Sequence, residues 1–381
     1  MTATRYDWDI FCTVVDNFGD IGVTLRLARQ LAHDYQQQVR LWVDDLQSTA
    51  RICPGLDATL ASQVYDGVNI CRWDTPFTAQ VMPAHRVIEA FACELPPEFR
   101  QQMKALSPAP LWLNLEYLSA EEWVEGCHRL PSWQPDGLTK YFFFPGFTPA
   151  TGGLLREQGL FAARDQWRGS AEESAYWAEL GIPVGQRQQE IWISLFTYEN
   201  PALFTLLEAW EQSPDPIRLW VPQGRTLDYI AARYSQVPPK AGDCWQRGNL
   251  SLQVLPFTDQ HGFDRLLWSC DFNFIRGEDS FVRAQWAAVP VIWHIYPQEE
   301  EAHMEKLDAF LERYLARWDE ASADLMRRFS RGYNQGKISA SDWNSLFIQR
   351  ELLKKNAIEW ADLLAETEDL ACQLVNFSES S

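Results

Sequence analysis

One short stretch of the chain combines the residue types that can hold an anion. Asp271–Gln285 begins with an apolar strand, Phe272–Ile275, turns at Gly277 and continues with apolar residues at helical spacing. Backbone N–H groups at a helix start, together with the positive end of the helix dipole, bind phosphates. Arg276 stands directly before the turn, and a guanidinium can form two parallel hydrogen bonds to a phosphate. This order predicts a nucleotide-phosphate site, although an ordinary helix after a strand shows the same spacing.

Three acidic or small residues mark the start of the expected helix. Glu278, Asp279 and Ser280 follow the glycine, and Asp and Ser at such positions cap free backbone N–H groups. Carboxylates beside a phosphate site also have a chemical use, because in a partly dry cleft they orient a cation or accept a proton. We therefore expect this helix start to take part in chemistry as well as in binding.

A second pair of carboxylates follows the first predicted strand, Trp8–Val15. The loop Asp16–Gly22 has two glycines in four positions, which suits a tight turn close to a ligand. Asp16 and Asp20 then stand at the carboxyl end of a strand, where open parallel sheets bind ligands. A helix cap for Asp20 and a turn role for Asp16 explain the two residues about equally well. The fingerprint GxGxxG is absent from this loop, so NAD binding is not indicated.

Short apolar strands alternate with helical patterns along most of the chain, which favours doubly wound parallel sheets. The further predicted strands are Val39–Val43, Val87–Phe91, Leu111–Leu115, Tyr141–Phe144, Ile191–Phe196, Ile217–Val221, Leu250–Leu255 and Val289–Trp293. We expect an α/β chain with two facing Rossmann-like domains and a ligand cleft between them. The expected boundaries are 1–160 for the first domain, 161–184 for a linker, 185–355 for the second domain and 356–381 for a helical segment that packs back on the first.

Composition excludes several classes of function. The 381 residues carry a formal net charge of −19, and binding to nucleic acid or an anionic membrane needs a basic surface instead. The eight Cys form no CxxC pair and the six His form no HExxH motif, so we expect reduced thiols, no metal site and a cytoplasmic location. No apolar run approaches the length of a membrane span, and the N-terminus lacks a signal-peptide pattern.

Several long motifs resemble the elongation factor P arginine rhamnosyltransferases, a family of bacterial enzymes. The resemblance extends from Trp8 to about Leu363. The motifs that carry it are Trp8–Leu31 (WDIFCTVVDNFGDIGVTLRLARQL), Val87–Pro96 (VIEAFACELP), Leu111–Glu121 (LWLNLEYLSAE), Phe274–Gln285 (FIRGEDSFVRAQ) and Trp293–Gln298 (WHIYPQ).

The resemblance implies a GT-B glycosyltransferase that acts with inversion and without a metal or other cofactor. Its donor would be dTDP-β-L-rhamnose, its acceptor an arginine of elongation factor P, and the modified factor would relieve ribosomes stalled at proline runs. The first domain would then bind the acceptor and the second domain the nucleotide sugar.

The resemblance also implies roles for individual residues. Asp20 resembles the family's general base, Glu278 a second essential carboxylate and Asp16 a further acidic residue near the acceptor arginine. The residues that fall on the nucleotide-sugar motifs are Asn17, Phe18, Gly19, Phe196, Tyr198, Phe257, Gln260, Arg276, Gly277, Asp279 and Ser280. Glu116 and Tyr117, at the end of a predicted strand, are candidates for acceptor binding.

The physical chemistry of these residues fits that assignment. A guanidinium is a poor nucleophile because its lone pairs are delocalised and its pKa lies above about 12. A carboxylate such as Asp20 can localise its charge and take a proton, while Phe196 and Phe257 would sandwich a thymine ring. Two rival interpretations stay open, namely a GT-B enzyme with another acceptor and a non-catalytic nucleotide-sugar-binding protein. A pure protein-interaction module would leave the glycine loops unexplained.

Overall fold

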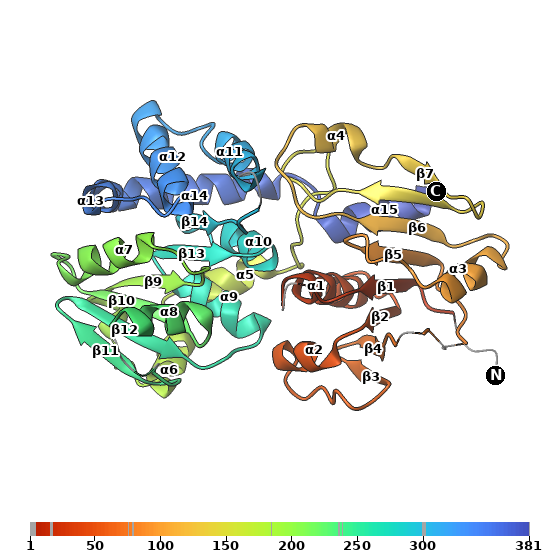
Figure 1. Cartoon of the computed structure of the whole chain (residues 1–381), viewed down its shortest axis with the longest axis horizontal. Helices are drawn as coiled ribbons and strands as arrows, with labels where there is room; N and C mark the ends of the chain where they lie inside the picture. The colour runs from red at the N-terminus through yellow and green to blue at the C-terminus, as the bar shows by residue number, and fades with distance from the viewer. Residues whose placement is uncertain are drawn as a thin grey trace. The chain divides into compact units, whose positions relative to one another are not determined.

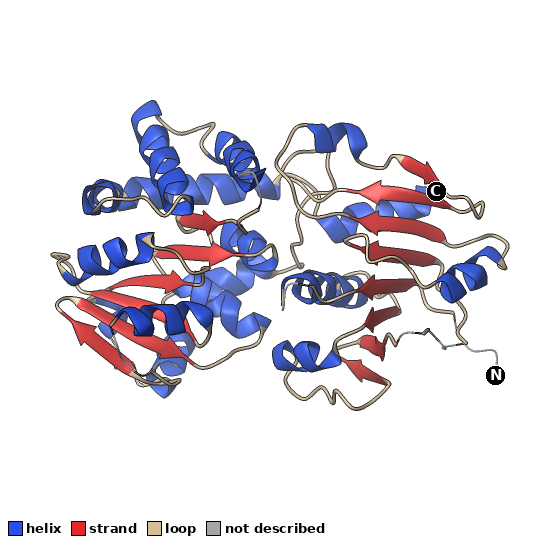
Figure 2. Cartoon of the chain, in the orientation of Figure 1, coloured by secondary structure: helices blue, strands red, loops and turns tan. Residues whose placement is uncertain are grey.

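The computed structural model describes residues 5–15, 18–74, 76–77, 80–183, 185–234, 237, 239–298 and 302–380. The chain forms two compact units, Met1–Gln158 with Leu364–Ser381, and Gly159–Leu363. Each unit is a largely parallel sheet covered by helices (Figures 1 and 2).

The sheet of unit 1 has the strand order β3-β4-β2-β1-β5-β6-β8-β7. The strands are β1 (Trp8–Cys12), β2 (Val39–Val43), β3 (Ser62–Tyr65), β4 (Val68–Arg72), β5 (Arg86–Ala90), β6 (Leu111–Leu115), β7 (Pro131–Trp133) and β8 (Thr139–Phe143). The central strands pair in parallel, and the two edge strands β3 and β7 pair antiparallel to their neighbours.

Strand β1 is buried along its whole length because helices cover both faces of this sheet. Ile10 packs on one face in a cluster that includes Leu27 of α1 and Leu374 of α15. Phe11 points to the other face and packs with Phe99 of α3. The helices of unit 1 are α1 (Gly19–His33), α2 (Leu46–Ile52), α3 (Pro97–Lys104), α4 (Trp123–Cys127) and α15 (Leu370–Ser380).

The sheet of unit 2 has the order β11-β12-β10-β9-β13-β14, in which only the edge strand β11, among the described residues, runs antiparallel to its neighbour. The strands are β9 (Ile191–Leu195), β10 (Ile217–Pro222), β11 (Cys244–Arg247), β12 (Leu250–Leu255), β13 (Phe272–Arg276) and β14 (Val291–His294). The helices are α5 (Leu160–Trp167), α6 (Ala171–Glu179), η1 (Gln186–Gln188), α7 (Ala202–Glu211), α8 (Arg225–Arg233), α9 (Gln260–Ser269), α10 (Asp279–Trp286), α11 (Ala302–Tyr314), α12 (Glu320–Asn334), α13 (Ala340–Ile348) and α14 (Arg350–Ala365).

Tryptophans fill both faces of the second sheet. Trp177, Trp192 and Trp220 meet on one face with ring centroids 4.6–5.0 Å apart. On the other face Trp210 and Trp343 lie 5.5 Å apart and pack with aromatic residues of β13. These large rings bury much apolar area per residue, and they explain why so many Trp are present.

The segment expected to be a linker, 161–184, contains helices α5 and α6 and belongs to unit 2. Trp167 and Trp177 are buried there, and both indole N–H groups donate to the Ser269 hydroxyl, at 2.9 and 3.2 Å. The chain returns to unit 1 at Leu364, not at residue 356, because α14 stays with unit 2 almost to its end. Leu370 and Leu374 of α15 then join the core of unit 1.

Two buried ion pairs fix elements inside the units. Arg40 donates to both oxygens of Asp9 at 2.6 and 2.8 Å in unit 1. Arg283 of α10 donates to both oxygens of Asp264 of α9 at 3.0 and 2.8 Å in unit 2, and each side chain is only 3% exposed. A two-point contact of this kind fixes the orientation of α10 against α9.

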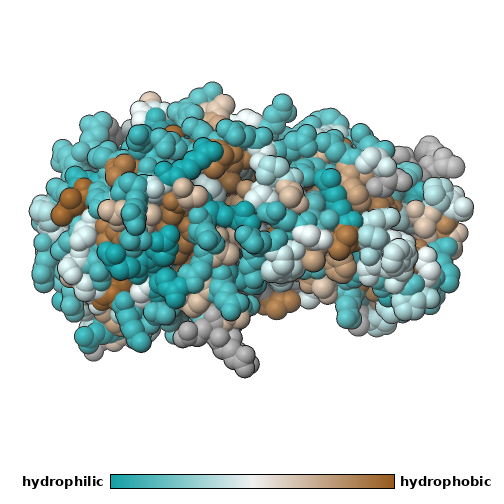
Figure 3. Space-filling view, turned by 90° about the horizontal axis from the view of Figure 1, so that it is seen from above, coloured by the Kyte–Doolittle hydropathy of each residue, from teal (hydrophilic) through white to brown (hydrophobic). Residues whose placement is uncertain are grey.

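The surface is mostly hydrophilic on the face shown in Figure 3, with apolar residues scattered over it. Within the described residues, no helix is both long and apolar enough to cross a membrane.

Candidate functional site

Asp20 is held at the start of α1 in unit 1 and is only 4% exposed. One carboxylate oxygen accepts the Val15 N–H at 3.1 Å, and the other accepts the Tyr117 hydroxyl at 3.1 Å. Asp20 does not cap the helix, because Phe18 occupies the N-cap position and the Asp20 carboxylate is directed to the loop before it. The structure thus positions this carboxylate through contacts from two directions.

Tyr117 connects Asp20 to the end of strand β5. Its ring stacks on Phe91 with centroids 4.4 Å apart and planes 16° from parallel. Phe91 has a φ of +55°, a conformation that is strained for a residue with a side chain. A role for Phe91 in the site could not be predicted from the sequence, because it depends on the stacking contact with Tyr117, 26 residues further along the chain.

Glu116 precedes Tyr117 and lies half-buried at the end of β6. Its carboxylate accepts the Asn114 amide N–H. Burial raises the pKa of Glu116, and the nearby Glu89 adds to the rise while Lys140 opposes it. A carboxyl with a raised pKa exchanges protons more readily near neutral pH.

The remaining predicted residues of unit 1 belong to the loop before α1. Asp16 and Asn17 lie outside the described residues. Phe18 and Gly19 begin the helix, and the Arg51 guanidinium lies 5.4 Å from the centre of the Phe18 ring.

Arg276 ends strand β13 in unit 2, and two aromatic rings hold its guanidinium. The guanidinium carbon lies 4.8 Å from the centre of the Phe196 ring and 4.5 Å from that of Tyr198. Both rings follow strand β9, the neighbour of β13. Phe196 therefore turns one face to Arg276, and the stacking of thymine on Phe196 and Phe257 stays a prediction.

The turn after Arg276 has the predicted form. Gly277 adopts a φ of +71°, a conformation that glycine takes without strain, and α10 begins at Asp279. The expected side-chain cap is not found, because Glu278 occupies the N-cap position and its side chain makes no capping hydrogen bond. Ser280 lies in the first turn. These residues are all partly exposed, so a ligand can reach the helix start.

The loop after β12 supports the same helix start. Gln260, the first residue of α9, donates its side-chain N–H to the Asp279 carboxylate at 3.1 Å. Asp259 caps α9 by accepting the Gly262 N–H at 2.8 Å. Phe257 in this loop is 44% exposed, as a ring that stacks on a ligand must be.

His294, at the end of β14, is a further site residue, and its role could not be predicted from the sequence. It pairs in register with Arg276, and its Nδ1 accepts the Tyr198 N–H at 3.3 Å. Burial, with smaller contributions from the charges of Arg276 and His303, lowers the pKa of His294 to about 4. The ring is therefore neutral near pH 7 and can accept this hydrogen bond.

The predicted residues of unit 2 thus gather at one edge of one sheet, beyond the carboxyl ends of β9, β12 and β13, and His294 at the end of β14 lies at the same edge. Open α/β sheets bind ligands at this edge. A guanidinium, a glycine turn and a helix start together can hold a diphosphate. Within the described residues no three His, Cys, Asp or Glu side chains cluster to hold a metal ion.

Two Rossmann-like units, one with a buried carboxylate and one with a glycine turn and a helix start suited to a phosphate, have the architecture of GT-B glycosyltransferases. A solved α-glucosyltransferase in complex with UDP and DNA shares the fold, with a TM-score of 0.50, 8% identity and 99% coverage of both chains.

The chain belongs to the family described as Elongation-Factor P (EF-P) rhamnosyltransferase EarP, whose profile matches residues 8–379. It is 50% identical to a protein-arginine rhamnosyltransferase of Pseudomonas putida over 98% of this chain and 99% of that protein. It is 51% identical to that of Pseudomonas aeruginosa over 97% of this chain and 98% of that protein. A solved structure on EarP-mediated arginine glycosylation of EF-P has a TM-score of 0.71, 36% identity, and coverage of 99% of this chain and 100% of that chain. The resemblance in the sequence is thereby confirmed.

Proposed function

We propose that this enzyme transfers L-rhamnose from dTDP-β-L-rhamnose to an arginine side chain of elongation factor P, with inversion at the sugar carbon. Family membership and relatives named protein-arginine rhamnosyltransferase support the reaction. The observation that carries the donor assignment is the Arg276 guanidinium held over Phe196 and Tyr198 beside a glycine turn and a helix start.

On the donor side, Arg276 and the backbone N–H groups of Asp279 and Ser280 would bind the diphosphate as it leaves. Positive charge at this position stabilises the negative charge that develops on the leaving group, so no metal ion is needed for that purpose. Phe257 would stack on the thymine. Phe18, Gly19, Gly277, Gln260 and Asn17 would complete the nucleotide-sugar site.

On the acceptor side, Asp20 would act as the general base. The arginine nitrogen attacks the sugar carbon, the bond from that carbon to the diphosphate breaks, and Asp20 takes the proton that the nitrogen loses. The hydrogen bonds from Val15 and Tyr117 hold the carboxylate in one orientation for this transfer. Glu278 and Asp16 would hold the guanidinium and localise its charge, and Glu116 would help to bind the acceptor.

The modified factor would relieve ribosomes stalled at proline runs, and the enzyme would act in the cytoplasm with its protein substrate.

Mass spectrometry of elongation factor P after incubation with the enzyme and dTDP-β-L-rhamnose tests the proposal. We expect a mass gain of one deoxyhexose on an arginine, and NMR of the product should show the inverted anomeric configuration. Asp20→Asn should abolish transfer while calorimetry still shows dTDP binding. Asp34→Asn, at the other end of α1, is the matched control and should remain active.

Each rival function predicts a different result in the same experiment. If the enzyme binds dTDP and transfers rhamnose to another molecule but adds no mass to elongation factor P, the result would favour a GT-B enzyme with a different acceptor. Binding without transfer to anything would favour a nucleotide-sugar sensor. Transfer at near wild-type rate by Asp20→Asn would refute Asp20 as the base.

A further inference from the structure

Unit 2 contains a pocket of about 320 Å³ that the proposed reaction does not use. The pocket is bordered by Trp192 near the start of β9, Asp271 directly before β13 and Val289 shortly before β14. These are the amino ends of parallel strands, whereas the proposed donor residues follow their carboxyl ends. A strand of five residues spans roughly 17 Å, so the pocket and the donor site lie at opposite edges of the sheet.

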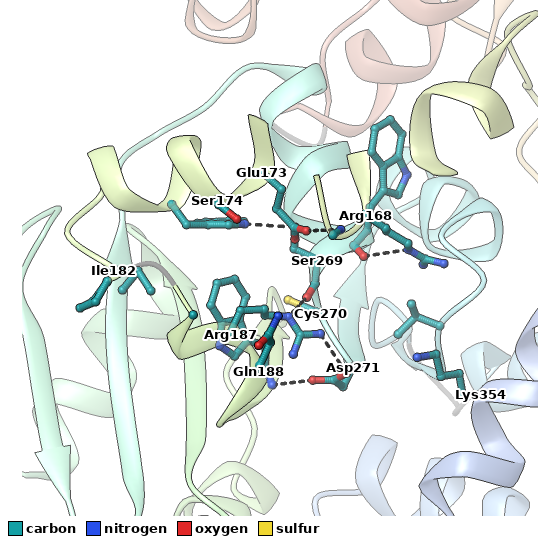
Figure 4. Close-up of a pocket in the computed structure, with 17 residues that line it drawn as sticks. Arg168, Glu173, Ser174, Ile182, Arg187, Gln188, Ser269, Cys270, Asp271 and Lys354 are labelled. Carbon is teal, nitrogen blue, oxygen red and sulfur yellow. Dashed lines mark hydrogen bonds and ion pairs between the residues drawn. The ribbon is translucent and has the colours of Figure 1, made fainter. Parts of the chain in front are cut away.

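Three cationic side chains from three separate segments line this pocket (Figure 4). They are Arg168 after α5, Arg187 in η1 and Lys354 in α14. The pocket contains two carboxylates, and both are engaged by protein groups. Asp271 accepts from Arg187 at 3.0 Å and from the Trp192 N–H at 2.8 Å, and Glu173 accepts the Gly169 N–H at 2.7 Å. Positive charge is therefore in excess.

The two guanidinium groups are fixed before any ligand arrives. Arg168 donates from Nε to the Trp268 carbonyl at 3.0 Å and from Nη2 to the Ala287 carbonyl. Arg187 donates from Nε to the Ser269 carbonyl at 2.9 Å, and its guanidinium lies 5.1 Å from the centre of the Trp192 ring. These carbonyls end α9 and α10, where cations bind favourably. Binding a ligand would thus cost little side-chain entropy at either arginine.

Both Arg168 and Lys354 retain donors for a ligand. In the described part of the chain no hydrogen bond from Arg168 Nη1 and no ion pair of Lys354 is found. Burial, with a contribution from Arg164 and Arg187, lowers the pKa of Arg168 to about 10, as expected of a guanidinium short of negative charge. An anion bound in the pocket would supply negative charge next to the Arg168 guanidinium.

The apolar part of the lining is aromatic. Trp268 borders the pocket and is partly exposed, whereas Trp177, Trp192 and Ile182 border it as buried members of the core. Indole rings favour flat apolar ligands, and they also raise the strength of nearby charge interactions by excluding water. The lining thus has two parts, one for charge and one for a flat ring.

We propose that this pocket binds a small organic anion, a phosphate ester or carboxylate that carries a flat apolar group. Arg168 and Lys354 contact the anionic group, and the partly exposed ring of Trp268 contacts the flat group. The site is separate from the one that binds the nucleotide sugar, and it does not depend on the proposed transferase reaction.

Calorimetry of the full chain with 2-naphthyl phosphate tests the proposal, with excess dTDP present to fill the donor site. We expect 2-naphthyl phosphate to bind at least about tenfold more tightly than either inorganic phosphate or 2-naphthol, a difference of about 1.4 kcal/mol. Lys354→Gln should weaken binding by about fivefold to tenfold, as expected for one charge-assisted contact.

The neighbouring Lys355 provides the matched control, because it lies on the same helix, does not line the pocket and pairs with Glu359 at 3.6 Å. Lys355→Gln should leave the affinity within about twofold of the wild type. Both lysines are exposed, so neither change threatens folding. No binding of 2-naphthyl phosphate at millimolar concentration, an equal loss of affinity in the two variants, or binding that occurs only when dTDP is left out would each overturn the proposal.

Discussion

Replacing Arg276 by alanine should weaken dTDP binding far more than it weakens the fold. Arg276 is the guanidinium beside the helix start, and a hydrogen bond to a charged group contributes about 1.5–3 kcal/mol. Its loss should therefore raise the Kd for dTDP by about 10- to 150-fold. The two ring contacts contribute about 0.5–1 kcal/mol each at partly exposed sites, so the free energy of unfolding should fall by only about 1–2 kcal/mol.

Isothermal titration with dTDP measures the change in Kd, and urea denaturation measures the change in the free energy of unfolding. Arg276→Lys should fall between wild type and alanine, because lysine keeps the charge but loses the planar fork. Arg247→Ala is the control, since that arginine lies on the edge strand β11, away from the donor residues, and pairs with Glu211 of α7. A Kd for the alanine variant within twofold of wild type would refute the reasoning, because Arg276 would then not contact the diphosphate.

Three further changes test other contacts. Tyr117→Phe keeps the ring stack but removes the donor to Asp20, so the rate of rhamnosylation should fall about tenfold while dTDP affinity stays constant; an unchanged rate would exclude a positioning role. Asp264→Ala removes the carboxylate that pairs with the buried Arg283 guanidinium and should lower the free energy of unfolding by about 3–5 kcal/mol in urea, whereas Asp324→Ala at an exposed pair should cost less than about 1 kcal/mol. Burial lowers the pKa of His294 to about 4, so the unfolded chain binds more protons between about pH 6.5 and 4 and stability falls as pH falls through that window, by up to about 3 kcal/mol. His294→Gln should flatten this dependence, and identical pH profiles would contradict it.

The buried strands could be predicted from the sequence because both of their faces are covered. Val39–Val43, Leu111–Leu115 and Leu250–Leu255 were predicted with the bounds that the structure shows. A strand without a solvent face gives a mostly apolar run, with only one or two polar residues in each of these three strands. The edge strands β3, β7 and β11 were missed, because their residues are mostly exposed or half-buried and leave no such run. Strand β4 was missed as well, although three of its five residues are buried.

The turn at Gly277 could also be predicted, since glycine is the residue type that adopts a positive φ without strain. The contacts around it could not. Arg276 meets Phe196 and His294 meets Tyr198 only after strands distant in sequence pair in the sheet. The place of α5 and α6 in unit 2 could not be predicted either. Their few apolar residues suggested a linker, whereas Trp167 and Trp177 are buried and donate hydrogen bonds to Ser269, which is distant in sequence.

The cluster of Trp177, Trp192 and Trp220 gives unit 2 an optical signature of its own. Three indoles within 5.0 Å of one another exchange excitation energy, so their fluorescence and near-ultraviolet circular dichroism respond as one group. Because Trp177 comes from α6 and the other two from the sheet, departure of that helix alone would change the spectrum. Loosening of this one helix can thus be followed without attaching any label.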